Sequence, residues 1–363
     1  MVNKAVNSGT DAQTGFALQR NTALYLLLEE YFVKFKGRKY FICLEHHDDF
    51  LFCFLNEKDE ALSIEAYQSK KKSPDRWSLN EEMYEIISKL LKTGKELLID
   101  SFPKIKGCKN LLFFTSNQTI SFEYKIPGIS KSATQTVKIK IKEDAHLVKY
   151  VNLHQEIKTK ITNGVTDILL HSELDNLHFL WIDLNRTVSK QENELVGQLE
   201  SVFKKKIIDH RAAVNCLISL FREIEVIYNQ GNIAKLLDVT KRVSSDQIED
   251  AFKILTTKSK AFEEWRNEKR EISDALGIKY SLRDTFEQKF NLAFDLFKSL
   301  TEAEHQKILK FVKDNFGKCN EIHLGDIVVE LHDLFLKENI CQFDTLDLMA
   351  IIYAAYFEAT FKH

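Results

Sequence analysis

The sequence contains few of the residues that interrupt helices. Of its 363 residues only 3 are proline and 12 are glycine. Because both residue types break helices and mark turns, their scarcity favours long helices and argues against a loop-rich fold. No apolar run approaches the about 20 residues that a membrane-spanning helix needs, so we expect no membrane partner.

Several functional signatures are also missing. The six cysteines include no Cys-x-x-Cys pair, which argues against a zinc site. No glycine-rich phosphate loop occurs, so the chain is not expected to hydrolyse nucleotides itself. The first residues do not resemble a signal peptide, and we expect a cytoplasmic location.

The chain has no overall basic excess. Its 51 lysines and arginines face 53 aspartates and glutamates, which gives a formal net charge of −2. A strongly basic chain would have suggested a nucleic-acid partner. Near-neutrality does not exclude one, because a local basic patch can contact phosphates.

What is present indicates a packed globule larger than one small domain. Hydrophobic residues make up 44% and charged residues 29% of the chain, and 26 phenylalanines predict an aromatic core. The length fits two domains, or one domain with a large extension.

The first half of the chain alternates between strands and helices. Apolar spacing predicts a helix over residues 11–36, and a second helix that begins with Ser78 as N-cap and Glu81 completing a capping box. Strands are expected over 39–45, 49–55, 61–70, 110–117, 137–142 and 177–184. This order predicts an α/β core, in which helices flank a mixed central sheet.

The second half is expected to be helical. From Thr187 onward amphipathic segments follow one another, and Phe286, Phe290, Phe294 and Phe297 repeat at helical spacing as core or interface residues. The pattern over 244–247 is typical of a capping box, and Asp344 is expected to cap the last helix. We therefore predict an all-α C-terminal region.

Four polar residues interrupt the apolar strands of the first half. Glu45 and Asp49 bracket the beginning of the second strand, and Gln68 and Lys70 end the third. Residues two apart in a strand share a face, so Gln68 and Lys70 project together while Ser69 points away. If these strands form an antiparallel hairpin, Asp49 lies beside Gln68 and Lys70.

This set of residues suits metal-dependent hydrolysis of a phosphodiester. Mg²⁺, or Mn²⁺ in its place, prefers oxygen ligands such as carboxylates. Asp49 would supply a carboxylate, and the Gln68 side-chain oxygen or a neighbouring carbonyl a second ligand. Glu45 would bind the metal, directly or through water, or accept a proton. Lys70 would hold the attacking water or stabilise developing negative charge.

The same residues resemble a known group of enzymes. The stretches 9–19, 45–50, 67–70 and 77–79, together with 114–117 and 179–184, resemble the PD-(D/E)xK nuclease superfamily in its Gln-x-Lys variant. They look most similar to the double-stranded-DNA endonuclease domain of CD-NTase-associated effectors of bacterial antiphage defence. One position departs from the pattern: Ser69 stands where relatives usually have an apolar residue.

The resemblance implies a restriction-endonuclease-like core and two regions with different functions. Residues 1–205 would form the endonuclease domain, and 206–363 a helical region for partner binding or oligomerisation. Relatives with a sensor for cyclic oligonucleotides carry an α/β C-terminal domain, which the helical pattern here does not match. The chain instead resembles the nuclease subunit of multi-component systems, paired with an SMC-like ATPase as in Lamassu or with a HerA-like ATPase. Release from the ATPase and self-assembly would then activate it.

The four polar residues also allow interpretations without a metal site. Asp49 and its neighbour Asp48 could form a solvated turn, Glu45 could be a surface residue, and Lys70 could belong to a solvated lysine run. Two alternative functions follow. One is a catalytically inactive nuclease fold that serves as a DNA-binding or structural subunit, and the other is a helical protein-binding adaptor.

Overall fold

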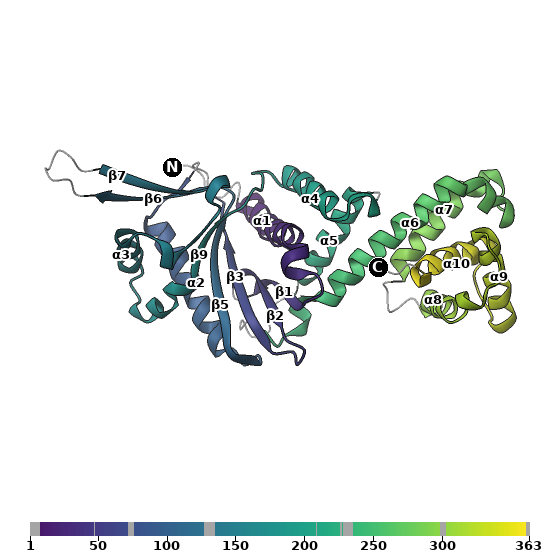
Figure 1. Cartoon of the computed structure of the whole chain (residues 1–363), viewed down its shortest axis with the longest axis horizontal. Coiled ribbons are helices and arrows are strands. Elements are labelled where there is room, and N and C mark those ends of the chain that lie inside the picture. The colour runs from purple at the N-terminus through teal and green to yellow at the C-terminus, as the bar shows by residue number, and fades with distance from the viewer. Residues whose placement is uncertain are drawn as a thin grey trace. The chain divides into compact units, whose positions relative to one another are not determined.

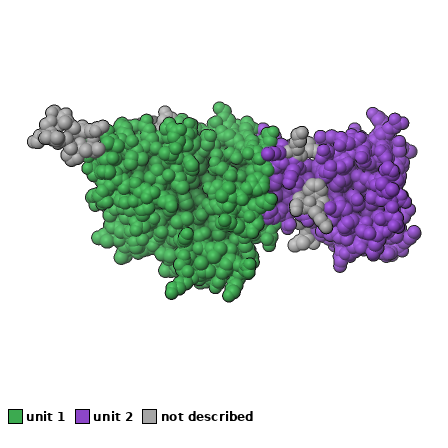
Figure 2. All heavy atoms as spheres, viewed as in Figure 1, with its two compact units in different colours: residues 1–202, 214–248 green, residues 203–213, 249–363 purple. Residues whose placement is uncertain are grey.

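The chain divides into two compact units (Figure 2). The computed structural model describes residues 8–46, 48–71, 76–126, 135–207, 209–225, 227, 235–297 and 303–360. Unit 1 comprises Met1–Val202 and Val214–Ile248, and unit 2 comprises Phe203–Ala213 and Glu249–His363. Each unit has a buried apolar core of its own. Unit 1 thus includes residues 214–248, which follow the boundary expected at residue 205.

Unit 1 contains a mixed sheet of seven strands in the order β10-β1-β2-β3-β5-β9-β8 (Figure 1). Strands β1, β2 and β3 form the expected antiparallel meander, and β5 and β9 continue the sheet in parallel with β3. The bounds are β1 Lys39–His46, β2 Asp48–Leu55, β3 Ala61–Ser69, β5 Lys104–Ser116, β8 Leu147–Lys149, β9 Leu177–Trp181 and β10 Arg242–Ser244. The predicted combination of a mixed sheet with helices is therefore present.

A smaller sheet and the helices complete this unit. The smaller sheet has the order β4-β6-β7, with bounds Arg76–Trp77, Thr119–Ile126 and Gln135–Ile141. The helices are α1 Ser8–Glu29, α2 Glu81–Ile99, α3 Gln155–Gly164, α4 Val188–Phe203 and most of α5 His210–Glu225. No helix within the described ranges is long and apolar enough to cross a membrane.

The two faces of the large sheet are covered by different helices. On one face α2 buries Met83, Ile86, Ile87, Leu90 and Leu91, the apolar stripe expected from the sequence, against strand residues such as Ala66. On the other face α1 contacts β2 and β3. Successive strand residues point to opposite faces, so the side chains of β3 alternate between the α2 face and the α1 face of the sheet.

Two helix termini differ from the prediction. The N-cap of α2 is Asn80 and not Ser78, because the Asn80 side chain accepts a bond of 3.0 Å from the backbone N–H of Met83. Asparagine caps a helix as well as serine does, and spacing alone did not separate them. The first helix ends at Glu29, and a π-helical turn over Tyr31–Phe35 follows in place of a continuous helix to residue 36.

Unit 2 is helical. It contains most of α6 Ser245–Ala275, together with α7 Arg283–Leu296, α8 Ala303–Asn315, α9 Leu324–Glu338 and α10 Thr345–Thr360. The repeated phenylalanines of α7 are buried in its core, which confirms the first of their two expected roles. The predicted cap of the last helix is also present, since the Asp344 carboxylate accepts from Asp347 N at 2.8 Å.

The region expected to be all-α includes one strand. The three residues of β10 pair antiparallel with β1, in the register Phe41 to Ser244 and Cys43 to Arg242. A strand this short has no detectable periodicity of its own, and the open edge of β1 supplies its hydrogen bonds. The predicted capping box follows at once, with Ser244 and Gln247 exchanging bonds of 2.9 and 3.2 Å.

Candidate active site

The three-stranded meander brings three of the four predicted residues into contact. In the β2–β3 pairing Phe50 lies opposite Tyr67 and Leu51 opposite Ala66, so Asp49 continues this register beside Gln68. The Gln68 amide nitrogen donates to one Asp49 carboxylate oxygen at 2.5 Å. The Lys70 ammonium lies 3.5 Å from both oxygens.

Asp49 is a buried carboxylate held by several donors. Only 8% of the residue is exposed, and its second oxygen also accepts from the backbone N–H of Ser69 at 2.6 Å. Burial raises the pKa of Asp49, while Lys70 and the bonds from Gln68 and Ser69 oppose the rise. The surrounding groups thus favour the charged form that burial disfavours.

Lys70 is positioned through its backbone. Its N–H donates to Thr115 O at 2.9 Å, and its carbonyl accepts from the Ser116 hydroxyl at 2.9 Å. The same hydroxyl accepts from the indole N–H of the buried Trp77 at 3.0 Å. Strand β5 and Trp77 therefore fix the end of β3, while the Lys70 side chain remains one-third exposed.

Glu45 lies at the end of β1 on the other side of Asp49. The β1–β2 register pairs Leu44 with Phe50 and His46 with Asp48, so Glu45 continues it opposite Asp49. Its φ of 51° is in the left-handed region, which costs about 1 kcal/mol for a residue with a side chain. Burial first, then the charges of Asp49 and Glu225, raise the pKa of Glu45 to about 7.

Residues from beyond position 205 also surround Glu45, although no pattern in the sequence pointed to them. Glu225 at the end of α5 forms a 2.7 Å ion pair with Arg20 of α1. Lys241, only 1% exposed, precedes β10 and donates to Ile224 O at 3.5 Å. Both Glu225 and Lys241 act electrostatically on Glu45. Local patterns could not reveal them, because long-range contacts place both: β10 pairs with β1 next to Lys241, and Arg20 of α1 binds Glu225.

Ser69 lies on the opposite face of β3, as strand alternation predicts. Its hydroxyl lies 3.3 Å from the Thr22 hydroxyl of α1. Nearby, Asn21 donates to Gln191 of α4 at 2.9 Å. This side of the strand end is thus a buried polar contact between β3 and α1.

The donor chemistry of the cluster fits a divalent cation. Glu45 and Asp49 offer carboxylate oxygens. The negative charge of Asp49 disfavours the charged form of Glu45, and a bound cation would offset this repulsion. The Gln68 amide points its nitrogen at Asp49, and a half-turn of the amide would present its oxygen. Within the described ranges, no three His, Cys, Asp or Glu side chains are grouped to hold a metal ion. Two carboxylates and one amide oxygen are the ligands that this cluster could offer to such an ion.

Comparison with family models, with curated proteins and with solved structures finds no match to this chain. The residues of the site therefore have to carry the functional assignment.

Proposed function

We propose that unit 1 is a metal-dependent endonuclease that hydrolyses phosphodiester bonds of double-stranded DNA. The observation that carries the proposal is the contact of Asp49 with Gln68 and Lys70 where β2 begins and β3 ends, with Glu45 opposite Asp49. A buried carboxylate beside a second carboxylate and a partly exposed lysine is the arrangement that hydrolysis with a divalent cation requires.

The arrangement of the secondary structure supports the same proposal. Helix α1, the antiparallel strands β1 to β3, helix α2 and the parallel strand β5 follow one another, with the polar cluster at one end of β2 and β3. This is the order of elements that a restriction-endonuclease-like core would have, and it agrees with the resemblance to the PD-(D/E)xK superfamily in its Gln-x-Lys variant.

Each residue of the cluster then has a chemical task. Asp49, Glu45 and the Gln68 amide oxygen would hold Mg²⁺ or Mn²⁺, which polarises the phosphate and lowers the pKa of a bound water. The Lys70 ammonium orients the attacking water and stabilises the negative charge that develops on the phosphate oxygens. Trp77 and Ser116 keep Lys70 in place through its carbonyl.

Cleavage of supercoiled plasmid by the full chain tests this function. Wild type is expected to cut with Mg²⁺ and not with EDTA. Lys70→Ala is expected to cut at least about 100-fold more slowly, the effect of losing one donor to a developing anion. The matched control is Lys71→Ala, an exposed lysine next in sequence, which should cut like wild type. Plasmid binding without metal-dependent cutting, also with partner proteins added, would support the inactive nuclease fold instead.

The cellular role is part of the same proposal. The chain would be the effector subunit of a cytoplasmic antiphage complex, held inactive by an SMC-like ATPase of the Lamassu kind, or by a HerA-like ATPase. Unit 2 would supply the surface for this partner; its exposed large apolar side chains include Tyr280, Ile322 and Ile340, which are 84%, 88% and 92% exposed. Released nuclease would assemble with itself, so that paired sites cut both strands.

Light scattering during gel filtration tests the assembly step. Activation by self-assembly predicts an oligomer of the isolated chain under the conditions in which it cuts DNA. A strict monomer that cuts would contradict activation by self-assembly and leave the nuclease assignment standing.

A further inference from the structure

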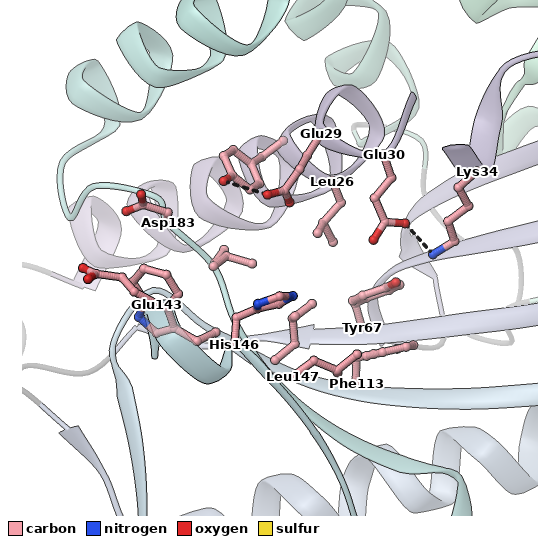
Figure 3. Close-up of a pocket in the computed structure, with 14 residues that line it drawn as sticks. Leu26, Glu29, Glu30, Lys34, Tyr67, Phe113, Glu143, His146, Leu147 and Asp183 are labelled. Carbon is pink, nitrogen blue, oxygen red and sulfur yellow. Dashed lines mark hydrogen bonds and ion pairs between the residues drawn. The ribbon is translucent and has the colours of Figure 1, made fainter. Parts of the chain in front are cut away.

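A pocket of about 540 Å³ lies in unit 1 on the face of the sheet opposite Asp49 (Figure 3). Its walls are largely apolar: Leu26 of α1, Tyr67 of β3, Phe113 of β5 and Leu147 of β8 line it. Tyr67 and Phe113 stack with their ring centroids 4.5 Å apart, which gives the pocket a rigid aromatic side.

Carboxylates surround these apolar walls. Figure 3 shows Glu29 and Glu30 where α1 ends, Glu143 in the turn before β8 and Asp183 after β9. Three chain segments that are distant in sequence thus bring acidic groups to one cavity.

The lining residues neutralise only part of this charge. Among the described residues that line the pocket, Lys34 is the one lysine or arginine, and it forms ion pairs with Glu30 at 3.0 Å and with the buried Glu65 at 2.7 Å. In the described part of the chain, no lysine or arginine pairs with Glu29, Glu143 or Asp183. The pocket therefore combines apolar walls with a rim that carries more acidic than basic groups.

One of these acids, Glu29, has a tyrosine as its partner. It accepts a bond of 3.3 Å from the Tyr25 hydroxyl. Burial raises the pKa of Glu29. The negative charges of Glu30 and Asp183 raise it further, whereas Tyr25 and His146 lower it. A cation in the pocket would stabilise the charged form of this carboxyl.

We propose that this pocket docks an arginine side chain of a partner protein. A guanidinium is a planar cation that forms bidentate bonds with carboxylates and stacks on aromatic rings, and its aliphatic stem suits apolar walls. The negative rim repels phosphate, so DNA is not the occupant. A protein segment fits better than free arginine, because Leu147, 42% exposed, extends the apolar wall to the rim where flanking residues would lie.

Calorimetric titration of the full chain with N-acetyl-arginine-amide tests the chemistry. N-acetyl-citrulline-amide is the matched control, because it has nearly the same shape without the charge. Saturable binding in the millimolar range is expected for the arginine compound, at least about 10-fold tighter than for citrulline, a difference of about 1.4 kcal/mol. Equal affinities, no saturable binding, or equally tight binding of N-acetyl-lysine-amide would each overturn the proposal.

Variants locate the binding to the pocket. Glu29→Gln with Asp183→Asn should weaken binding of the arginine compound about 10-fold or more, whereas Glu85→Gln, an exposed acid on α2, should leave it unchanged. Acetyl-Leu-Arg-Leu-amide should bind more tightly than the single residue if the occupant is a protein segment. An affinity no better than that of the single residue would contradict the protein source. None of these readouts depends on DNA cleavage.

Discussion

Each face of the paired strands β2 and β3 carries a buried carboxylate close to a lysine, and the two pairs differ. On the α1 face Glu65 accepts from Lys34 at 2.7 Å and from the Tyr67 hydroxyl at 2.7 Å. On the α2 face Asp49 is bonded to Gln68 at 2.5 Å, while the Lys70 ammonium is 3.5 Å away. The first pair is a close ion pair, and Lys34 has a second partner in Glu30 at 3.0 Å. The second leaves the lysine partly exposed and its charge available to another group.

This difference is the one expected if Glu65 makes a structural contact and Asp49 belongs to the proposed metal site. A short ion pair completed by a tyrosine hydroxyl fixes α1 and the π-helical turn on the sheet. A longer pair beside a second carboxylate, Glu45, retains an excess of negative charge that burial makes unfavourable. Such charge persists where a bound cation compensates it, and perturbed carboxylates of this kind gather at functional sites.

The largest expected effect is on DNA cleavage, when Asp49 on the α2 face of the sheet loses its charge. Asp49→Asn keeps the size of the side chain and removes its charge. Metal-dependent plasmid cleavage should fall at least about 100-fold, while the free energy of unfolding in urea changes by about 1 kcal/mol or less. Loss of activity together with loss of folding would show that Asp49 is a structural residue like Glu65.

The second prediction concerns stability on the α1 face. Glu65→Ala removes the acceptor of the Tyr67 hydroxyl and one partner of Lys34, so the free energy of unfolding should fall by about 3 kcal/mol. The control Glu30→Ala removes the more exposed partner of Lys34 and should cost less than about 1 kcal/mol. Urea unfolding followed by circular dichroism measures both, and equal losses would contradict the assigned difference.

The third prediction uses the pH dependence of stability. The pKa of Glu45 is raised from 4.5 to about 7 by burial, Asp49 and Glu225. Between these values the folded protein binds more protons than the unfolded chain, so the contribution of Glu45 to stability declines as pH rises from about 4.5 to 7. In Glu45→Gln this decline should be smaller. Unfolding curves at several pH values, with Glu85→Gln as the control, measure the difference, and identical slopes would argue against a buried Glu45 carboxyl.

The smallest expected effect concerns Ser69. Ser69→Ala removes the 3.3 Å contact with the Thr22 hydroxyl and keeps the backbone N–H that donates to Asp49. Stability should change by about 1 kcal/mol or less, and cleavage should remain at the wild-type level. A large loss of cleavage would mean that the two faces of β3 are coupled.

Much of the fold follows from local patterns in the sequence. Strand alternation and helical spacing predict the meander, the buried stripe of α2 and the buried phenylalanines of α7. The predicted helix ends were wrong where the local sequence allowed more than one end point. Asn80 caps α2 in place of Ser78, and the π-helical turn over Tyr31–Phe35 has the same composition as a continuing helix.

The sequence was enough to predict that Asp49, Gln68 and Lys70 lie together, because an antiparallel hairpin joins residues about 20 positions apart and strand alternation selects their face. The groups that act on Glu45 could be identified from the tertiary packing alone: Lys241 directly precedes β10, which pairs with β1, and Glu225 forms an ion pair with Arg20 of α1. The tertiary packing also decided the charge and depth of the pocket. Burial and long-range electrostatics depend on how distant segments pack, and no single stretch of sequence records that.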